Sequence, residues 1–296
     1  MFYIDMACNI TYYSSEKKNR PSIDTIMTKC KELNVLPLFI GTDEKSNEES
    51  LKLAKEYNTF CTLGIHPTES SRFLSIGLDN QYFNKLLQLY NDNENVLAIG
   101  ECGLDWDRLK FSSKDDQIKV LKMQLSLFDK NTDLPYFFHC RSAYQEFLNI
   151  LKNQSEKYKT LKGIIHCFTG NKSDLELILN NTNLYIGLTG LFFNLSDYDI
   201  GDIFLPPLNR LFLETDSPYC KLKNVTLTRL NEFITKKDGE PLKSNQTFKN
   251  HYTSCDIPLL YKFVAKLYDI TEEQLKEQIY NNFRELFKNK SIKTNF

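Results

Sequence analysis

Eight short apolar runs, separated by longer amphipathic stretches, constrain the fold of this chain more than any other feature of its sequence. The runs have the length of β-strands and lie at 2–5, 36–41, 60–65, 96–101, 134–139, 162–167, 184–189 and 210–214. Apolar residues with helical spacing fill several of the intervals, at 81–90, 115–130, 143–152 and 172–181. Apolar strands that alternate with helices are typical of a parallel sheet covered on both faces. Eight such units predict an α/β fold, a (β/α)8 TIM barrel.

The length of the chain fits one such domain. A barrel of this kind typically needs about 250 residues, and the chain has 296, so we expect a single domain over 1–296. The polar stretch 221–256 is expected to be a loop or insertion, followed by C-terminal helices within 257–288. The formal net charge is only −1, which excludes a strong overall attraction for polyanions. A nucleic acid would have to be bound locally, through a metal ion and a few basic side chains.

Cysteine usage and the start of the chain indicate a compartment. The eight cysteines include no CxxC pair, and the first residues contain neither a charged segment nor a long apolar stretch. No apolar run approaches the roughly 18 residues that a membrane span needs. We therefore expect free thiols, no membrane association, and a cytoplasmic or nuclear location.

Potential metal ligands lie at the ends of the predicted strands. Glu101 ends the fourth strand, His139 ends the fifth, His166 lies near the end of the sixth, and Asp216 follows the eighth. The carboxyl ends of the strands are the face on which barrel enzymes build their active sites. Imidazole and carboxylate together suit Zn, Mn, Fe or Mg. The sequence therefore predicts a metal site made by these four side chains.

Each of these residues also has a structural interpretation when it is taken alone. A histidine at a strand end is often a hydrogen-bonded core residue, Asp216 could cap a helix, and Arg141 could form a structural salt bridge. Their joint placement on one rim favours the metal site. Because side chains alternate along a strand, His139 and Arg141 should share a face. The neighbouring cysteines should then pack outward as small core residues, with a Cys₃His site as the alternative; they are Cys102, Cys140 and Cys167.

The sequence resembles the TatD-type deoxyribonucleases of the metallo-dependent hydrolase superfamily. Four segments carry the resemblance: AIGECGLDWDR (98–108), LPYFFHCR (134–141), GIIHCFTG (163–170) and LFLETDSPY (211–219). Three more fit in the same order: LGIHP (63–67), YIGLTG (185–190) and YNNFRELF (280–287). The resemblance implies a metal-dependent phosphodiester hydrolase acting on DNA, with RNA as an alternative substrate. It further implies 3′–5′ exonucleolytic trimming of single-stranded or frayed ends.

The resemblance also implies roles for individual residues. Glu101 would bridge or share two metals. The site would hold one or two divalent ions, with Mg first and Mn or Zn as alternatives. The imidazoles of His139 and His166 would bind metal, and Asp216 would bind metal and position water. At the substrate phosphate the resemblance places Arg141 and His66, the latter with a catalytic role as well. No obligate protein partner is inferred.

Two segments depart from the family pattern. Many relatives carry an H-x-H pair on the first strand, whereas this chain has Ala7 and Asn9 within IDMACNIT and resembles the subset that lacks the pair. Asn9 is therefore a candidate for a weak metal or water ligand. The segment NHYTSCDIP (250–258) replaces an R-N-E-P-like sequence, which leaves the substrate contacts of this loop open.

Two other functions remain as alternatives. One is an amidohydrolase or lactonase acting on C–N or C–O bonds, although such enzymes commonly place a carboxylated lysine where this chain has Glu101. The other is a catalytically weakened barrel that binds nucleic acid or protein. If the substrate or ligand is a nucleic acid, the aromatic residues near the rim are candidates to stack a base; they are Trp106, Phe168 and Tyr219.

Overall fold

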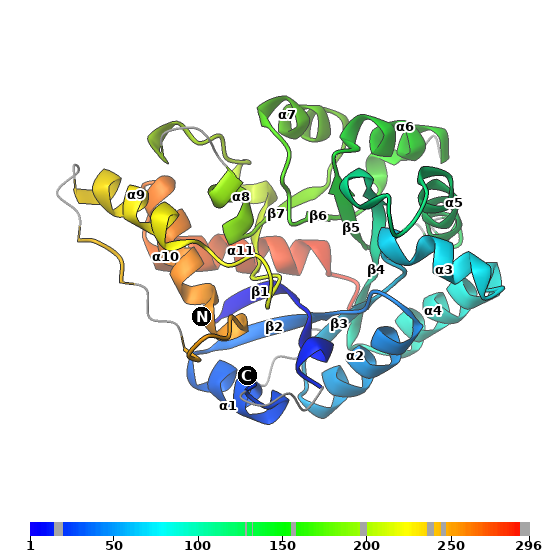
Figure 1. The fold of residues 1–296 in the computed structure, drawn as a ribbon, viewed down its shortest axis with the longest axis horizontal. Coiled ribbons are helices and arrows are strands. Elements are labelled where there is room, and N and C mark those ends of the chain that lie inside the picture. Colours follow the sequence, from blue (N-terminus) through cyan, green and yellow to red (C-terminus); the bar gives the residue numbers. More distant parts are fainter. Residues whose placement is uncertain are drawn as a thin grey trace. The chain divides into compact units, whose positions relative to one another are not determined.

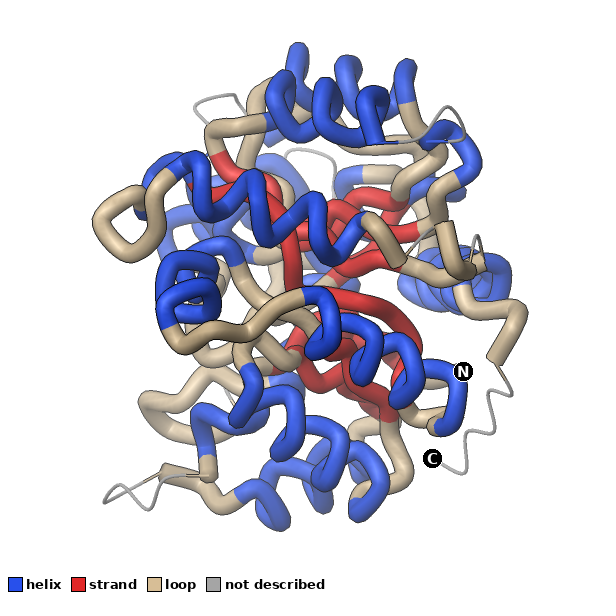
Figure 2. Tube along the Cα trace, turned by 90° about the vertical axis from the view of Figure 1, so that its right-hand side faces the viewer, coloured by secondary structure: helices blue, strands red, loops and turns tan. Residues whose placement is uncertain are grey.

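Eight strands and the helices between them make up the computed structural model of the chain. It describes residues 1–14, 20–127, 129–131, 133–154, 158–195, 200–235, 240–243 and 247–290. The strand order in the sheet is β1-β2-β3-β4-β5-β6-β7-β8, and helices alternate with strands along the chain (Figures 1 and 2). The pairings from β3 to β7 are parallel. The predicted class, a (β/α)8 TIM barrel, is confirmed.

The described residues divide into two compact units. One comprises Met1–Leu38 and Gly187–Phe283, and the other comprises Phe39–Ile186 with residues 284–290. Strands β2 (Val35–Ile40) and β7 (Tyr185–Leu188) each contain the point at which the division falls.

The unit around Phe39–Ile186 is built on four central strands: β3 (Phe60–Leu63), β4 (Val96–Asp105), β5 (Tyr136–Arg141) and β6 (Gly163–His166). Its helices are α2 (Glu44–Glu56), α3 (Ser70–Ser75), α4 (Asn80–Asp92), α5 (Lys114–Leu125), α6 (Tyr144–Gln154) and α7 (Lys172–Asn181). Helix α2 packs against β3, α4 and α5 pack against β4, and α6 packs against β5 (Figure 1).

Side-chain caps set the starts of several of these helices. The Asp43 carboxylate accepts from the backbone N–H of Ser46 at the start of α2, and Ser113 does the same for Asp116 in α5. Such caps satisfy backbone donors that a helix cannot pair internally. They fix where each helix begins: α2 begins four residues after the end of β2, and α5 begins after the segment 106–113 that follows β4.

The other unit contains the first and last strands, β1 (Tyr3–Cys8) and β8 (Leu211–Leu213), which contact each other. Its helices are α1 (Ile23–Glu32), α8 (Gly190–Leu195), α9 (Asn224–Thr235), α10 (Ile257–Leu267) and most of α11 (Glu272–Leu286). The buried Tyr261 of α10 fixes this helix to β1, because its hydroxyl donates to the carbonyl of Ile4 and accepts from the N–H of Ile4.

One predicted strand boundary was wrong, and a stretch predicted as a loop or insertion contains a helix. The fourth strand runs to Asp105 instead of ending at Glu101, because residues 102–105 continue to pair with β5 and are buried throughout. The stretch 221–256 is not simply a loop, because it contains α9 and a short 3-10 helix at Ser254–Asp256. Leu227, Leu230 and Ile234 bury one face of α9, a periodicity that the surrounding Thr and Asn residues obscured. Parts of this stretch, 236–239 and 244–246, lie outside the described residues.

Helix length and polarity bear on membrane association. Within the described ranges, every helix is too short or too polar to cross a bilayer.

Candidate metal centre

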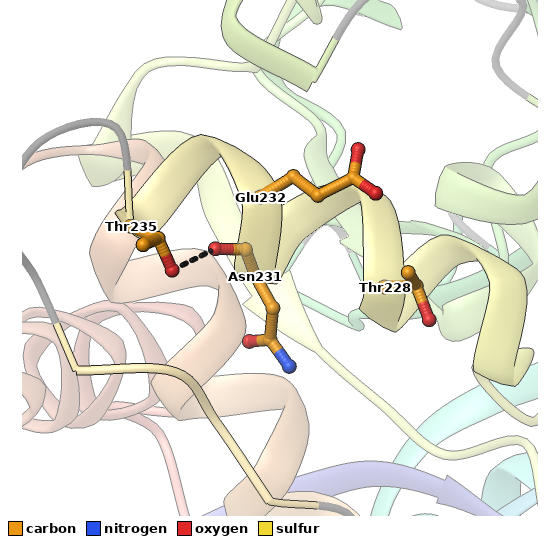
Figure 3. A pocket seen from close by; sticks show the side chains of 4 residues that line it. All are labelled: Thr228, Asn231, Glu232 and Thr235. Carbon is orange, nitrogen blue, oxygen red and sulfur yellow. Dashed lines mark hydrogen bonds between the residues drawn. The ribbon is translucent and has the colours of Figure 1, made fainter.

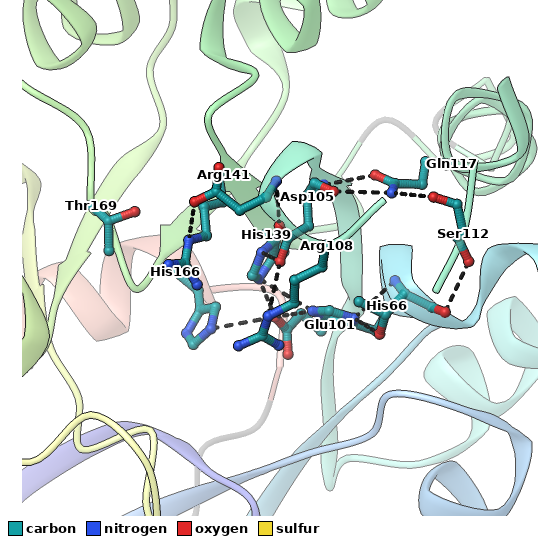
Figure 4. A network of polar contacts seen from close by, with 12 residues as sticks. His66, Glu101, Asp105, Arg108, Ser112, Gln117, His139, Arg141, His166 and Thr169 are labelled. Atoms are coloured by element: carbon teal, nitrogen blue, oxygen red, sulfur yellow. Dashed lines mark hydrogen bonds and ion pairs between the residues drawn. The ribbon is translucent and has the colours of Figure 1, made fainter. Parts of the chain in front are cut away.

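Three imidazole rings converge on one carboxylate oxygen in the unit around Phe39–Ile186 (Figure 4). The Oε1 atom of Glu101 lies 2.8 Å from Nδ1 of His139 and 3.3 Å from Nε2 of both His66 and His166. Glu101 lies on β4, while His139 and His166 lie opposite each other on β5 and β6. His66 is the third residue after the end of β3. The structure thus brings together four of the side chains that the sequence singled out.

Glu101 carries a negative charge at the centre of this cluster. Burial opposes ionisation of the carboxyl group, but the imidazoles of His166, His66 and His139 outweigh it and hold the pKa of Glu101 well below its usual range. An ionised carboxylate among histidine nitrogens is a donor set suited to a divalent cation. Ligand atoms of His66, Glu101 and His139 all lie within 4.8 Å of one another.

His139 lies between two carboxylates. Its Nδ1 faces Glu101, and its Nε2 is 3.1 Å from Oδ2 of Asp105. Burial alone would lower the pKa of His139, but the hydrogen bonds with Asp105 and Glu101 raise it to about 9. Without metal the ring is therefore an imidazolium that donates both protons. Metal in place of the Nδ1 proton would leave the Nε2–H bond to Asp105 intact.

His66 differs from His139 in charge and in hydrogen-bonding role. Its Nδ1 accepts from the backbone N–H of Thr68 at 3.1 Å, so the ring proton resides on Nε2, which faces Glu101. Burial lowers the pKa of His66, which keeps the ring neutral near pH 7. His66 is thus a neutral hydrogen-bond donor, which fits the predicted contact with phosphate better than metal ligation through Nε2.

Asp105 is a site residue that the sequence analysis missed. Its backbone N–H donates to Oε1 of Gln117 at 2.7 Å, and its carbonyl accepts from Nε2 of Gln117 at 3.0 Å. A signal was available in the sequence. Glu101, Gly103 and Asp105 are spaced two residues apart, so they share one face of a strand that continues beyond Glu101.

Arg141 is engaged with an acidic neighbour. Its Nε atom lies 2.9 Å from Oδ2 of Asp107, which belongs to the 3-10 helix Trp106–Arg108 that follows β4. The Asp107 side chain is exposed and that of Arg141 is half-buried. The guanidinium lies on the same strand face as His139, as alternation predicted, while Cys140 is buried on the other face.

The cysteines beside the candidate ligands follow the prediction only in part. Cys102 and Cys140 are buried, as expected for small core residues. The prediction was wrong for Cys167, which is half-exposed and has φ 45°. All eight cysteines are free thiols.

Asp216 and Asn9 belong to the other unit, where they contact each other. The Nδ2 atom of Asn9 donates to Oδ1 of Asp216 at 2.8 Å, and Sγ of Cys220 donates to Oδ2 at 3.1 Å. The neighbouring Thr215 is held by the buried Asp5, which accepts from its N–H and hydroxyl at 2.7 Å each. Asn9 thus meets the carboxylate that the sequence analysis named as a ligand.

A pocket on α9 offers no comparable chemistry. Its lining consists of Thr228, Asn231, Glu232 and Thr235, and the Thr235 hydroxyl donates to the carbonyl of Asn231 (Figure 3). One carboxylate without an imidazole is a poor site for a catalytic metal.

The predicted stacking residues differ in exposure. Phe168 is completely buried, so the prediction that it stacks a base was wrong. Tyr219 is 62% exposed, and Trp106 is half-buried.

Comparisons with known proteins agree with this geometry. The family described as TatD related DNase matches residues 4–288. A TATDN1 homologue from Encephalitozoon cuniculi is 36% identical over 245 residues, which cover 80% of this chain and 82% of the relative. A 3′-5′ ssDNA/RNA exonuclease TatD from Erwinia tasmaniensis is 28% identical, covering 97% and 99%. The crystal structure of a TatD family hydrolase from Entamoeba histolytica superposes with a TM-score of 0.78 at 25% identity, covering 97% and 98%.

Proposed function

Because the chain belongs to the TatD related DNase family, we propose that it is a divalent-metal-dependent nuclease that hydrolyses phosphodiester bonds of DNA. The observation that carries this proposal is the convergence of His66, His139 and His166 on the buried carboxylate of Glu101. Phosphodiester hydrolysis needs a nucleophilic water and relief of charge on the phosphoryl oxygens, and this cluster can supply both around a cation.

Glu101, His139 and His166 are the proposed protein ligands of one ion. The resemblance adds Asp216 as a further ligand or as the base that accepts a proton from water. A bound divalent ion would lower the pKa of that water and polarise the phosphate. The resemblance implies Mg²⁺ and one or two ions, whereas imidazole ligands favour Mn²⁺ or Zn²⁺. Metal analysis of the purified protein by mass spectrometry distinguishes these ions.

The remaining residues would bind and orient the substrate. The neutral Nε2–H of His66 is placed to donate to a phosphoryl oxygen or to the leaving oxygen. Arg141 could add a charge-assisted contact if substrate phosphate displaces Asp107 from its guanidinium. Asn9 would orient Asp216 through the bond to Oδ1.

The direction of cleavage and the cellular site are part of the same proposal. A relative named as a 3′-5′ ssDNA/RNA exonuclease supports trimming from 3′ ends of single-stranded or frayed DNA, with RNA as a second substrate. Eight free cysteines support a reducing compartment, the cytoplasm or the nucleus.

The test compares the wild type with Glu101→Gln, which keeps the shape of the side chain and removes its charge. We expect metal-stimulated release of nucleotides from a 3′-labelled single strand to fall by at least about a thousandfold, with an unchanged circular dichroism spectrum. A Glu101→Gln protein that degrades DNA as fast as the wild type would refute the proposal.

The same preparation tests the two alternatives. An amidohydrolase or lactonase would turn over cyclic amides or lactones and leave a dinucleotide ester intact. A non-catalytic barrel would show no metal-dependent turnover on any of these substrates.

A further inference from the structure

We propose that the segment joining β4 to α5, residues 106–113, is a platform on which the bases of a single-stranded nucleic acid stack beside the metal centre. The proposal rests on the proposed nuclease function and adds how the enzyme holds the strand. It names a surface that contributes to substrate binding without contacting the scissile phosphate.

The segment exposes two large apolar side chains close together. Leu109 is 40% exposed and Phe111 is 56% exposed. A single exposed apolar side chain is ordinary, but two flanking one lysine in a short connection form a local apolar surface. Every base has an aromatic face, so an exposed ring such as Phe111 can stack a base of any sequence.

Cationic groups accompany the aromatic rings of the segment. Nζ of Lys110 lies 4.9 Å from the ring centroid of Phe111, and Nζ of Lys114 lies 3.8 Å from that of Trp106. Within the described ranges, neither ammonium group is in an ion pair with a carboxylate. Rings for bases combined with lysines for the backbone phosphates are the combination that proteins use for single strands.

Hydrogen bonds fix both ends of the segment. The buried Gln117 of α5 donates to the carbonyls of both Asp105 and Ser112 and accepts from the N–H of Asp105 (Figure 4). The Ser112 hydroxyl donates to the carbonyl of Thr68 and accepts from the N–H of Ser71. Phe111 is therefore presented by a segment clamped at both ends, which reduces the entropy lost when a base binds.

The residues that hold the two ends of the segment are also hydrogen-bonded to histidines of the candidate metal centre. Asp105 hydrogen-bonds to His139, and Thr68 hydrogen-bonds to Nδ1 of His66. A strand whose phosphate is at these imidazoles would have neighbouring nucleotides within reach of the segment. This continuity, together with the two lysines, favours a nucleic-acid strand over a protein partner as the occupant.

The experiment measures KM for a single-stranded ten-residue oligothymidylate and kcat/KM for bis(4-nitrophenyl) phosphate, with the metal-loaded full chain. For Phe111→Ala we expect KM for the oligonucleotide to rise by about 5- to 150-fold, the effect of losing one stacked base. Hydrolysis of the small diester, which has no nucleotide bases, should not change. Phe111→Trp should retain oligonucleotide binding, because it keeps an aromatic face.

Ile76→Ala is the matched control, because Ile76 is 53% exposed in the same unit and lies outside the segment. It should leave both substrates unaffected. An unchanged KM for Phe111→Ala, or an equal loss on both substrates, would overturn the platform. So would a change from dimer to monomer in Phe111→Ala without a change in KM, since the surface would then join two copies of the chain.

Failure of the proposed function is separable from failure of the platform. If the wild type hydrolyses neither diester, the nuclease assignment fails. Fluorescence anisotropy with labelled oligothymidylate in EDTA then tests the platform separately. The platform requires Phe111→Ala to bind the oligonucleotide more weakly than the wild type does. Equal binding by the two proteins would overturn it.

Discussion

The carboxylate of Asp105 lies 3.1 Å from Nε2 of His139, on the opposite side of the ring from Glu101. The imidazole of His139 thus lies between the carboxylate of Asp105 and the candidate metal ligand Glu101, an arrangement that would fix the ring orientation and raise the basicity of a metal-bound histidine. Asp105 is in turn fixed by Gln117 through two backbone hydrogen bonds. Helix α5 therefore supports the proposed ligand His139 through a single carboxylate.

The first prediction concerns this support. Asp105→Asn keeps the size of the side chain but removes the negative charge that holds His139, so metal affinity should fall by about 10- to 100-fold. Isothermal titration with Mn²⁺ measures the affinity. Asp107→Asn is the control, because Asp107 pairs with Arg141 and not with an imidazole. Equal metal affinities for wild type and Asp105→Asn would contradict the role assigned to Asp105.

The second prediction concerns pH. The pKa of His139 is about 9 in the metal-free protein, so below pH 9 the metal must displace a proton from the ring. Raising the pH removes this competition, and Glu101 stays ionised throughout because its pKa is well below its usual range. Metal affinity should therefore rise by up to about tenfold per pH unit from pH 7 to pH 9 and level off above. In Asp105→Asn, which lacks one of the bonds that raise this pKa, the plateau should begin at a lower pH.

The features that could be predicted from the sequence depend on residues close together along the chain. The eight strands were predictable because each is a short run of apolar residues, and apolar residues in such a run are expected to be buried. The convergence of His139 and His166 on Glu101 was predictable because parallel strands end at one rim. In contrast, the ion pair of Arg141 with Asp107 and the burial of Phe168 depend on how distant segments pack. Asp105 was missed because the strand continues past Gly103, where the apolar run is interrupted, through its pairing with β5.

The third prediction concerns Gly103, which lies between Glu101 and Asp105 on β4. Its φ is +148°, and a Cβ there would lie 1.8 Å from the carbonyl oxygen of His139. Gly103→Ala must therefore push β4 and β5 apart at the site, lowering the free energy of unfolding by more than about 2 kcal/mol and weakening metal binding. Chemical denaturation and metal titration measure the two effects.

Gly77→Ala is the control that separates the cost of the backbone conformation from the cost of the steric clash. Gly77 also has positive φ, at +75°, but a Cβ there would have no atom within 4 Å, so its substitution should cost only about 1 to 2 kcal/mol from the backbone conformation. Metal affinity should be unchanged in this variant. A Gly103→Ala protein that is no less stable than Gly77→Ala would show that β4 can move away from His139 at little cost.

The fourth prediction distinguishes the role of Asn9 from that of Asp216. Among the described residues, Asn9 donates to Oδ1 of Asp216 and Cys220 donates to Oδ2, so Asn9→Ala removes one of these two bonds that orient the carboxylate. A hydrogen bond to a charged group contributes about 1.5 to 3 kcal/mol when it is well shielded, and this one is only partly buried. We therefore expect kcat/KM on a single-stranded oligonucleotide to fall by about 3- to 10-fold in Asn9→Ala and in Cys220→Ala. In Asp216→Ala, which loses the carboxylate itself, activity should be abolished. If Asn9→Ala is as inactive as Asp216→Ala, then Asn9 is itself a metal or water ligand, and the first strand contributes directly to the chemistry despite the lack of the histidine pair.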